Sequence, residues 1–180
     1  LRGRERTLGQ TLADPAMAAG AKRSLLQRLL EGRVGTGAFD LIVETADQRW
    51  STDRDMVDAM DEAGASLLLM SAEKDGRLDR VEEEIFRFGR IIDSTPDLQM
   101  ALTNPAIDEQ SKAAIVSQLL DGKADPLTVS LLQTATTELH GRPVQTAVAD
   151  LSALAARRRG RVVAEVRTAT PLSDEQTSRL

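Results

Sequence analysis

Few residues in this chain are suited to catalysis, and its single histidine is the first to consider. His140 stands between Leu139 and Gly141, an order typical of a helix end, where an imidazole can satisfy the last carbonyls and complement the helix dipole. No serine or aspartate is spaced around it as a nucleophile or an orienting acid would be. The chain has no cysteine, which excludes disulfides, thiolate metal sites and cysteine nucleophiles. We therefore expect no catalytic residue, no metal ligand and no cofactor.

An acidic run and a glycine-rich stretch each match a functional motif only in part. Three consecutive glutamates occupy positions 82–84, and adjacent helix positions splay around the axis instead of converging on one ligand. We interpret them as a solvated helix face, with pairing to Arg80 and Arg87. The stretch GRVGTG, residues 32–37, follows a predicted helix and lacks the Gly-Lys-Ser/Thr ending of a phosphate-binding loop. It is predicted to be a linker.

A basic cluster, Arg157 to Arg159 with Arg161, allows two interpretations. It either binds nucleic acid or anionic lipid, or forms a solvated helix end that is favoured by the helix dipole and can meet an acidic partner surface. No aromatic side chain lies nearby to stack bases, and the formal net charge of −5 argues against nucleic acid as the main partner. A helical nucleic-acid-binding or generic adaptor module that uses residues 157–161 remains the alternative function.

The composition favours packed amphipathic helices. Three Phe, one Trp and no Tyr occur among 180 residues, too few aromatics for a typical β-sandwich. No apolar run approaches the ~18–20 residues of a membrane span, and no stretch resembles a signal peptide. The sequence starts within one predicted helix and stops as another begins. We therefore expect a piece of a longer polypeptide that is soluble and intracellular.

The clearest pattern is an internal repeat. LADPAMAAGAKRSLLQRLLEG begins at Leu12, and LTNPAIDEQSKAAIVSQLLDG begins at Leu102, 90 positions later and without a gap. Each stretch carries a Pro near its start, a Lys at the same later position, and a Leu-Leu-acid-Gly ending. The period is too long, and the copies too few, for a solenoid. We interpret the repeat as a partial domain duplication.

The second copy predicts a six-helix bundle over residues 63–160. Its helices are predicted from the spacing of apolar residues, from proline at first helical positions, and from N-caps at Thr95, Asp108 and Asp125. The predicted helices are 63–74, 79–93, 96–103, 108–121, 126–140 and 143–160. The residues expected to face inward are Val81, Ile85, Phe88, Ile92, Ile115, Leu119, Leu120, Leu127, Leu131, Leu132, Ala135, Leu139, Val144, Val148, Leu151, Leu154 and Ala155.

The first copy, residues 1–62, is a partial duplicate. Helices are expected at 5–12, at 16–30, from 36 or 38 to 50, and at 52–63, and the last of these runs straight into the helix at 63–74. Trp50, the only tryptophan, either fills the gap between the copies or anchors a partner.

The last 20 residues have a different pattern. Residues 162–168 alternate like a strand, and Ser173 with Gln176 has the spacing of a capping box. We expect residues 161–180 to start an α+β C-terminal domain.

The stretch ASLLLMSAEKDGRLDRVEEEIFRFGRIIDSTPDLQMALTNPAIDEQSK, together with ELHGRPVQTAVADL and GRVVAEVRTATPLSDEQ, resembles the delta subunit of F-type ATP synthase. Its mitochondrial relative is the oligomycin-sensitivity-conferring protein. The resemblance covers residues 63 to 180, and the segments occur in the family's order. Residues 1–62 resemble the duplicated helices of a form in which the delta-type domain is fused behind a b-type stalk chain.

The resemblance implies a non-catalytic stator subunit that holds the catalytic head to the b-type stalk against rotor torque. The implied partners are N-terminal helices of the head's alpha subunits and a b-type stalk chain, which in the form that residues 1–62 resemble is fused in the same polypeptide. No nucleic acid and no membrane insertion of this fragment are implied. The implied location is peripheral, at the cytoplasmic face of the cell membrane. In that family an alpha-subunit helix lies in a groove, here between residues 63–74 and 126–139. Its predicted lining residues are Leu67, Leu68, Leu131, Leu132 and Ala135.

Overall fold

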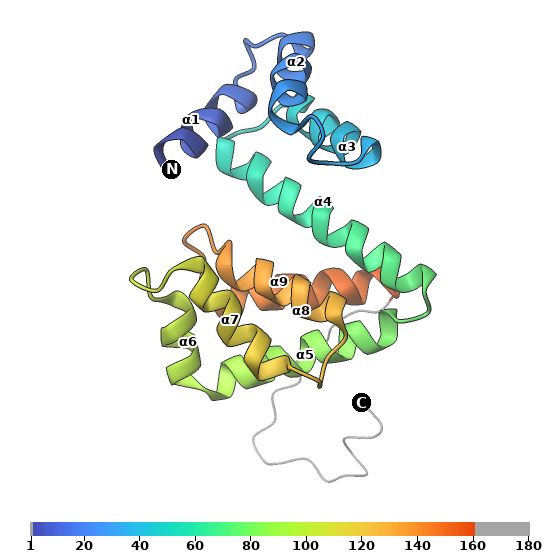
Figure 1. The fold of residues 1–180 in the computed structure, drawn as a ribbon, viewed down its shortest axis with the longest axis vertical. Coiled ribbons are helices and arrows are strands. Elements are labelled where there is room, and N and C mark those ends of the chain that lie inside the picture. Colours follow the sequence, from blue (N-terminus) through green and yellow to red (C-terminus); the bar gives the residue numbers. More distant parts are fainter. Residues whose placement is uncertain (1, 161–180) are drawn as a thin grey trace. The chain divides into compact units, whose positions relative to one another are not determined.

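The computed structural model describes residues 2–160, and these residues form nine helices without a strand (Figure 1). The mainly α fold predicted from the sequence is confirmed for this range. The predicted strand at 162–168 and the capping box at Ser173 lie outside the described residues. The helices are α1 (Arg2–Ala13), α2 (Ala19–Leu30), α3 (Thr36–Asp47), α4 (Asp53–Lys74), α5 (Leu78–Ser94), α6 (Pro96–Thr103), α7 (Glu109–Leu120), α8 (Pro126–Thr137) and α9 (Val144–Arg158).

The chain divides into two compact units, Leu1–Asp75 with α1–α4 and Gly76–Leu180 with α5–α9. Helix α4 is a single helix of 22 residues, started by a reciprocal capping box between Thr52 and Asp55. The predicted domain boundary at residues 62 and 63 falls inside this helix, where the two copies were expected to join without a break. No helix within residues 2–160 has both the length and the apolar composition that a membrane span requires.

Helix α5 supplies a continuous apolar face to the core of the second unit. Val81, Ile85, Phe88 and Ile92 are all buried, as their four–three–four spacing predicts. This face packs mainly along α9, with smaller contacts to α6 and α8. The predicted N-caps at Asp108 and Asp125 are confirmed, because their carboxylates accept from the backbone N–H groups of Ser111 and Leu127. Thr95 precedes Pro96 at the start of α6 but makes no side-chain cap.

Helix α7 faces the core with a different stripe from the one predicted. Leu119 is 39% exposed and Ile115 is half-buried, so the prediction that both point inward is wrong. The buried residues are Lys112, Val116 and Leu120, spaced by four. The sequence pattern hid this stripe because it begins with a lysine, whose methylene stem can pack like an apolar side chain. Three other predicted core residues, Leu127, Ala135 and Leu154, are also half-buried.

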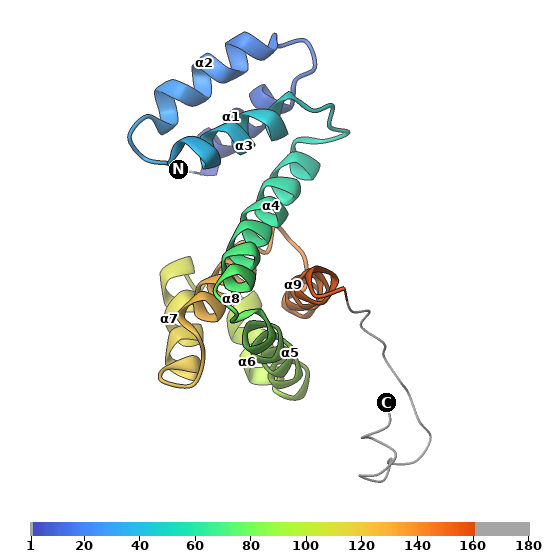
Figure 2. The ribbon, with the colours of Figure 1, turned by 90° about the vertical axis from the view of Figure 1, so that its right-hand side faces the viewer.

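The repeat in the sequence is a repeat in space. Helices α1 to α4 pair with one another as α6 to α9 do, α2 with α3 like α7 with α8, and α1 with α4 like α6 with α9. Figure 2 shows α2 beside α3 in the first unit. At the matching positions 12 and 102, 22 and 112, and 26 and 116, all six side chains are buried. The glycines that follow α2 and α7, Gly32 and Gly122, both have left-handed φ angles of 70° and 63°, which favour glycine.

The first unit has its own small core. It consists of Leu12, Leu26, Val43, Ala46 and Met56. The buried Lys22 donates through Nζ to the carbonyl oxygen of Ala46 at 2.7 Å, which satisfies a carbonyl in the last turn of α3. Trp50 packs against this core, and its Nε1 donates to the carbonyl of Thr45 at 2.8 Å. The tryptophan is therefore part of the first unit's packing, a role that neither interpretation from the sequence included.

A matched pair of phenylalanines on α5 tests this packing. Phe88 is 1% exposed and Phe86 is 48% exposed. We expect Phe88→Ala to lower the free energy of unfolding by about 3–5 kcal/mol, because it leaves a cavity in the core. We expect Phe86→Ala to change it by less than about 0.5 kcal/mol. Urea unfolding followed by circular dichroism measures both, and equal losses would contradict the packing described for α5.

Candidate functional site

The predicted partner-binding residues on α4 are accessible. Leu67 is 44% exposed and Leu68 is 38% exposed, and Met70 next to them is 45% exposed. A strip of three large apolar side chains on one helix, open to solvent, is suited to contact with another apolar surface.

The predicted residues on α8 are in a different environment. Leu131 and Leu132 are 3% and 0% exposed, and Ala135 is half-buried. The two leucines therefore contribute to packing within the protein, and only Ala135 among the three offers part of its surface to a partner. The lining role of the whole set stays a prediction.

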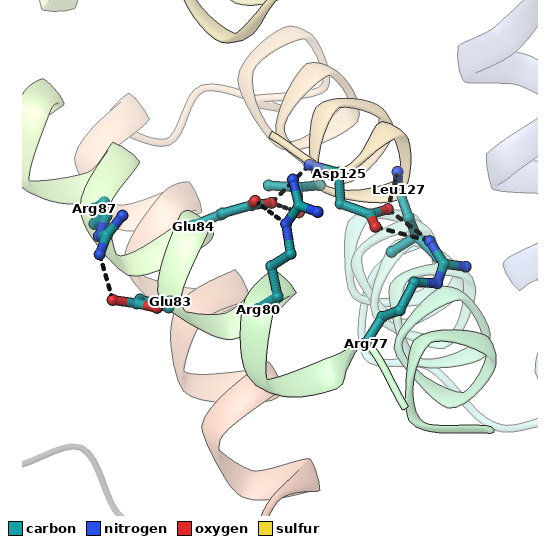
Figure 3. Close-up of polar contacts among 8 residues, drawn as sticks. Arg77, Arg80, Glu83, Glu84, Arg87, Asp125 and Leu127 are labelled. Carbon is teal, nitrogen blue, oxygen red and sulfur yellow. Dashed lines mark hydrogen bonds and ion pairs between the residues drawn. The ribbon is translucent and has the colours of Figure 1, made fainter. Parts of the chain in front are cut away.

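A polar network joins α5 to the start of α8 (Figure 3). The sequence predicted its Arg80–Glu84 pair and the cap at Asp125, and both are confirmed, as is the Arg87–Glu83 pair beside it. It did not predict the contacts between the two helices. The Oε2 atom of Glu84 accepts from the backbone N–H of Asp125 at 2.8 Å and from the Thr128 hydroxyl at 2.6 Å. Its Oε1 atom accepts from Nε of Arg80 at 2.7 Å. One carboxylate on α5 thus holds two groups of the first turn of α8.

Asp125 forms the second half of this network. Its two carboxylate oxygens accept from one guanidinium nitrogen of Arg77 at 2.7 and 2.9 Å. One of them also accepts from the backbone N–H of Leu127 at 2.9 Å, which caps α8. The Asp125 residue is buried, so these hydrogen bonds replace the water that its carboxylate would otherwise bind. Figure 3 shows Arg77 and Arg80 both reaching toward this end of α8.

The network keeps both carboxylates ionised. Burial by itself would raise the pKa of Glu84, but hydrogen bonds from Thr128, Arg80 and the Asp125 N–H outweigh it and hold the pKa below its usual value. Burial likewise acts to raise the pKa of Asp125, and hydrogen bonds from the Leu127 N–H and Arg77 lower it below its usual value. Neither group is suited to act as a general acid near neutral pH. The arrangement is that of a structural clamp.

A second set of ion pairs joins the end of α9 to the start of α5. The guanidinium of Arg159 pairs with Asp79 at 2.6 Å and also with Glu82. The side chains of Arg159 and Glu82 are mostly buried, whereas Glu83 and its partner Arg87 are exposed. The prediction of a solvated acidic run is therefore right for Glu83 and wrong for the glutamates on either side of it.

The arginines of the basic cluster also differ in their surroundings. Arg157 and Arg158 are exposed in the last turn of α9, as the helix-end interpretation predicted. Arg159 is engaged with α5, and Arg161 lies outside the described residues. His140 is half-buried in the turn between α8 and α9 with a φ of 48°. Helix α8 ends at Thr137, so His140 lies three residues beyond it rather than in its last turn.

The clamp is tested by a pair of amide substitutions. Glu84→Gln keeps one oxygen, but its NH2 group must face either the Arg80 guanidinium or the donors of α8. We expect it to lower the free energy of unfolding by about 1–3 kcal/mol. Glu83→Gln, one position earlier and exposed, should change it by less than about 0.5 kcal/mol. Urea denaturation of the two variants at pH 7 measures the difference, and equal values would show that Glu84 holds nothing.

The lowered pKa values predict a direction for acid sensitivity. A carboxylate whose pKa is lower in the folded than in the unfolded chain stabilises fully above its unfolded pKa, which is about 4. That stabilisation is lost as the pH falls below this value through the folded pKa. We expect the urea concentration at the midpoint of unfolding to stay constant between about pH 7 and 5.5 and to decrease below about pH 4.5. The fall should be shallower in Glu84→Gln, and identical slopes would contradict the pKa assignment.

Comparison with protein families gives one match, which covers most of the chain. The family model described as ATP synthase delta (OSCP) subunit matches residues 64–180. That range begins within α4 and includes the whole of α5 to α9.

Individual relatives extend the similarity to the first copy. A protein called ATP synthase subunit delta from Streptomyces avermitilis is 44% identical over 177 residues, 98% of this chain and 65% of the relative. Its counterpart from Streptomyces coelicolor has the same identity and coverage, and that from Acidothermus cellulolyticus is 42% identical over 173 residues. This chain spans 63 to 65% of the length of these three curated relatives. A family model that matches well over half of the residues, with relatives that align across both copies, shows that this chain belongs to the ATP synthase delta (OSCP) subunit family.

Proposed function

We propose that this chain is part of a non-catalytic peripheral-stalk subunit of a proton-translocating F-type ATP synthase. Its role is to hold the alpha/beta catalytic head to a b-type stalk chain against the torque of the rotor. The observation that carries this proposal is the family match over residues 64–180, supported by relatives named ATP synthase subunit delta. Its proposed place is peripheral, at the cytoplasmic face of the cell membrane, and the proposal includes a b-type chain fused in the same polypeptide.

The packing of the second unit suits a mechanical role. Arg159 ties α9 to α5 at one point, and Glu84 ties α5 to α8 at another. Hydrogen bonds between charged groups have defined directions, whereas apolar contacts can slide. Ties of this kind resist shear between helices, which is what a load on a stator applies.

The proposed partner is an amphipathic N-terminal helix of an alpha subunit. The exposed strip of α4, Leu67, Leu68 and Met70, offers the apolar surface that such a helix would bury. On α8, the buried Leu131 and Leu132 would fix the shape of the helix, and the half-buried Ala135 would meet the partner. The partial duplicate could add a second contact of the same kind, which the stoichiometry of binding would reveal.

An aspartate scan of exposed apolar residues tests the partner surface. Calorimetric titration of the chain with a synthetic alpha-subunit N-terminal helix should give saturable binding. Leu67→Asp should weaken it at least about tenfold, because a charge replaces a buried apolar contact. Met100→Asp is the matched control, since Met100 is 65% exposed and lies on α6.

The control should bind like the unmodified chain. Equal binding by the unmodified chain, Leu67→Asp and Met100→Asp would show that the partner does not bind at α4. Absence of any binding by the folded chain would overturn the proposed contact with alpha-subunit helices.

A further inference from the structure

Helix α4 has a glycine near its middle that packing does not require. Gly64 lies within the 22 residues of this helix, Asp53–Lys74, and its φ is not in the left-handed region. A Cβ added to it would meet no packed neighbour within 4 Å among the described residues, so alanine would fit at this position. Glycine weakens a helix interior relative to alanine, because it loses more conformational freedom on folding. Gly64 is therefore a weak point of α4 that neither a close contact nor a turn explains.

The core of the first unit supports α4 as far as Met60. Met56 belongs to that core, and Met60, one turn further along, packs against it. In the part of the chain that the structure describes, no member of this core and no side chain packed against it lies beyond Gly64. The exposed strip of α4 follows the glycine. The half of α4 before Gly64 is thus held by the core of the first unit, and the half after it is not.

The second copy has a different residue at the matching position. The counterpart of Gly64 is Ala155 of α9, because the loop before α9 is one residue longer than the loop before α4. Ala155 is 0% exposed, whereas Gly64 is exposed. Helix α9 ends at Arg158, but α4 continues to Lys74. Gly64 therefore stands close to the point where α4 becomes longer than its counterpart.

The side chains on either side of Gly64 do not brace the helix across it. Side chains three or four positions apart are neighbours on a helix surface. Each such pair that crosses Gly64 includes Ala63, Ala65 or Ser66, so none joins two charges or two large apolar groups. Sharp bends in helices are found where glycine and serine occur together. The sequence around Gly64 therefore favours bending.

We propose that Gly64 is a hinge of α4. The half of the helix that carries the exposed strip bends at this glycine relative to the half that packs in the core of the first unit. Each half keeps its own hydrogen bonds, and the bend stretches those that residues 65–68 donate across Gly64. A partner on the exposed strip turns with its half of the helix and leaves the core of the first unit undisturbed. The hinge does not depend on which partner that is.

Spin labels on introduced cysteines test the hinge, because the chain has no cysteine of its own. Glu44→Cys on α3 and Ser71→Cys on α4 place labels at exposed positions of the first unit, before and after Gly64 in the chain. Glu44→Cys with Arg28→Cys is the reference pair, which lies on α3 and α2. Double electron–electron resonance measures the distribution of distances for each pair. We expect the distribution across Gly64 to be wider than the reference, and Gly64→Ala to remove most of the excess width.

Moving the glycine separates a hinge from general stabilisation. Gly64→Ala combined with Ala65→Gly should restore the wide distribution. Gly37→Ala, at a position of α3 where a Cβ is also free of contacts, should leave it unchanged. A distribution across Gly64 that is as narrow as the reference in the unmodified chain would overturn the proposal, as would a width that Gly64→Ala does not change.

Hydrogen exchange measures the size of the effect in the same variants. The amides of residues 65–68 donate across Gly64, and we expect them to exchange about fivefold more slowly in Gly64→Ala, because alanine favours the helix. Gly37→Ala should leave their rates unchanged. Equal rates in Gly64→Ala and the unmodified chain would show that the glycine does not weaken α4, which also overturns the hinge.

Discussion

The second unit depends on the burial of one face of α5. Helices of 8 to 15 residues, such as α6 to α9, are marginal by themselves in water and are stabilised by packing. Helix α5 contacts α6, α8 and α9, and its four fully inward residues, Val81, Ile85, Phe88 and Ile92, are among the most completely buried in the chain. Without this face, α6, α8 and α9 would lose the surface that they share, and α7, which packs on α8, would lose its support.

Ion pairs and hydrogen bonds fix the position of α5 along its axis, which apolar burial alone does not determine. Burial along α9 is non-directional and would tolerate small shifts of α5 along its axis. Arg159 binds Asp79 and Glu82 near the start of α5, and Glu84 binds α8 one turn further on. Charge-assisted hydrogen bonds of this kind set register as well as stability. The charged groups that looked most like a functional site in the sequence are thus used to hold the fold.

The two copies share their buried apolar positions but not the polar contacts that hold α5 to α8. Leu12 and Leu102, and Lys22 and Lys112, are buried at matching places. The first unit has glycine and alanine where Asp125 and Thr128 anchor α5. Within the described residues, the duplication therefore reproduced a helical framework without the polar anchors of α5.

The sequence by itself determined the helices, the caps at Asp108 and Asp125, the repeat and the family. Each of these depends on residues a few positions apart, such as the spacing of Val81 and Ile85 or the cap at Asp125, or on segments that match as wholes. Tertiary structure decided which charges are buried. Glu84 meets partners 41 and 44 residues away, and Arg159 meets Glu82 across 77 residues. It also chose Val116 over Leu119 for the core. No local pattern specifies these outcomes, because the environment of a helix face is set by whichever distant helix packs against it.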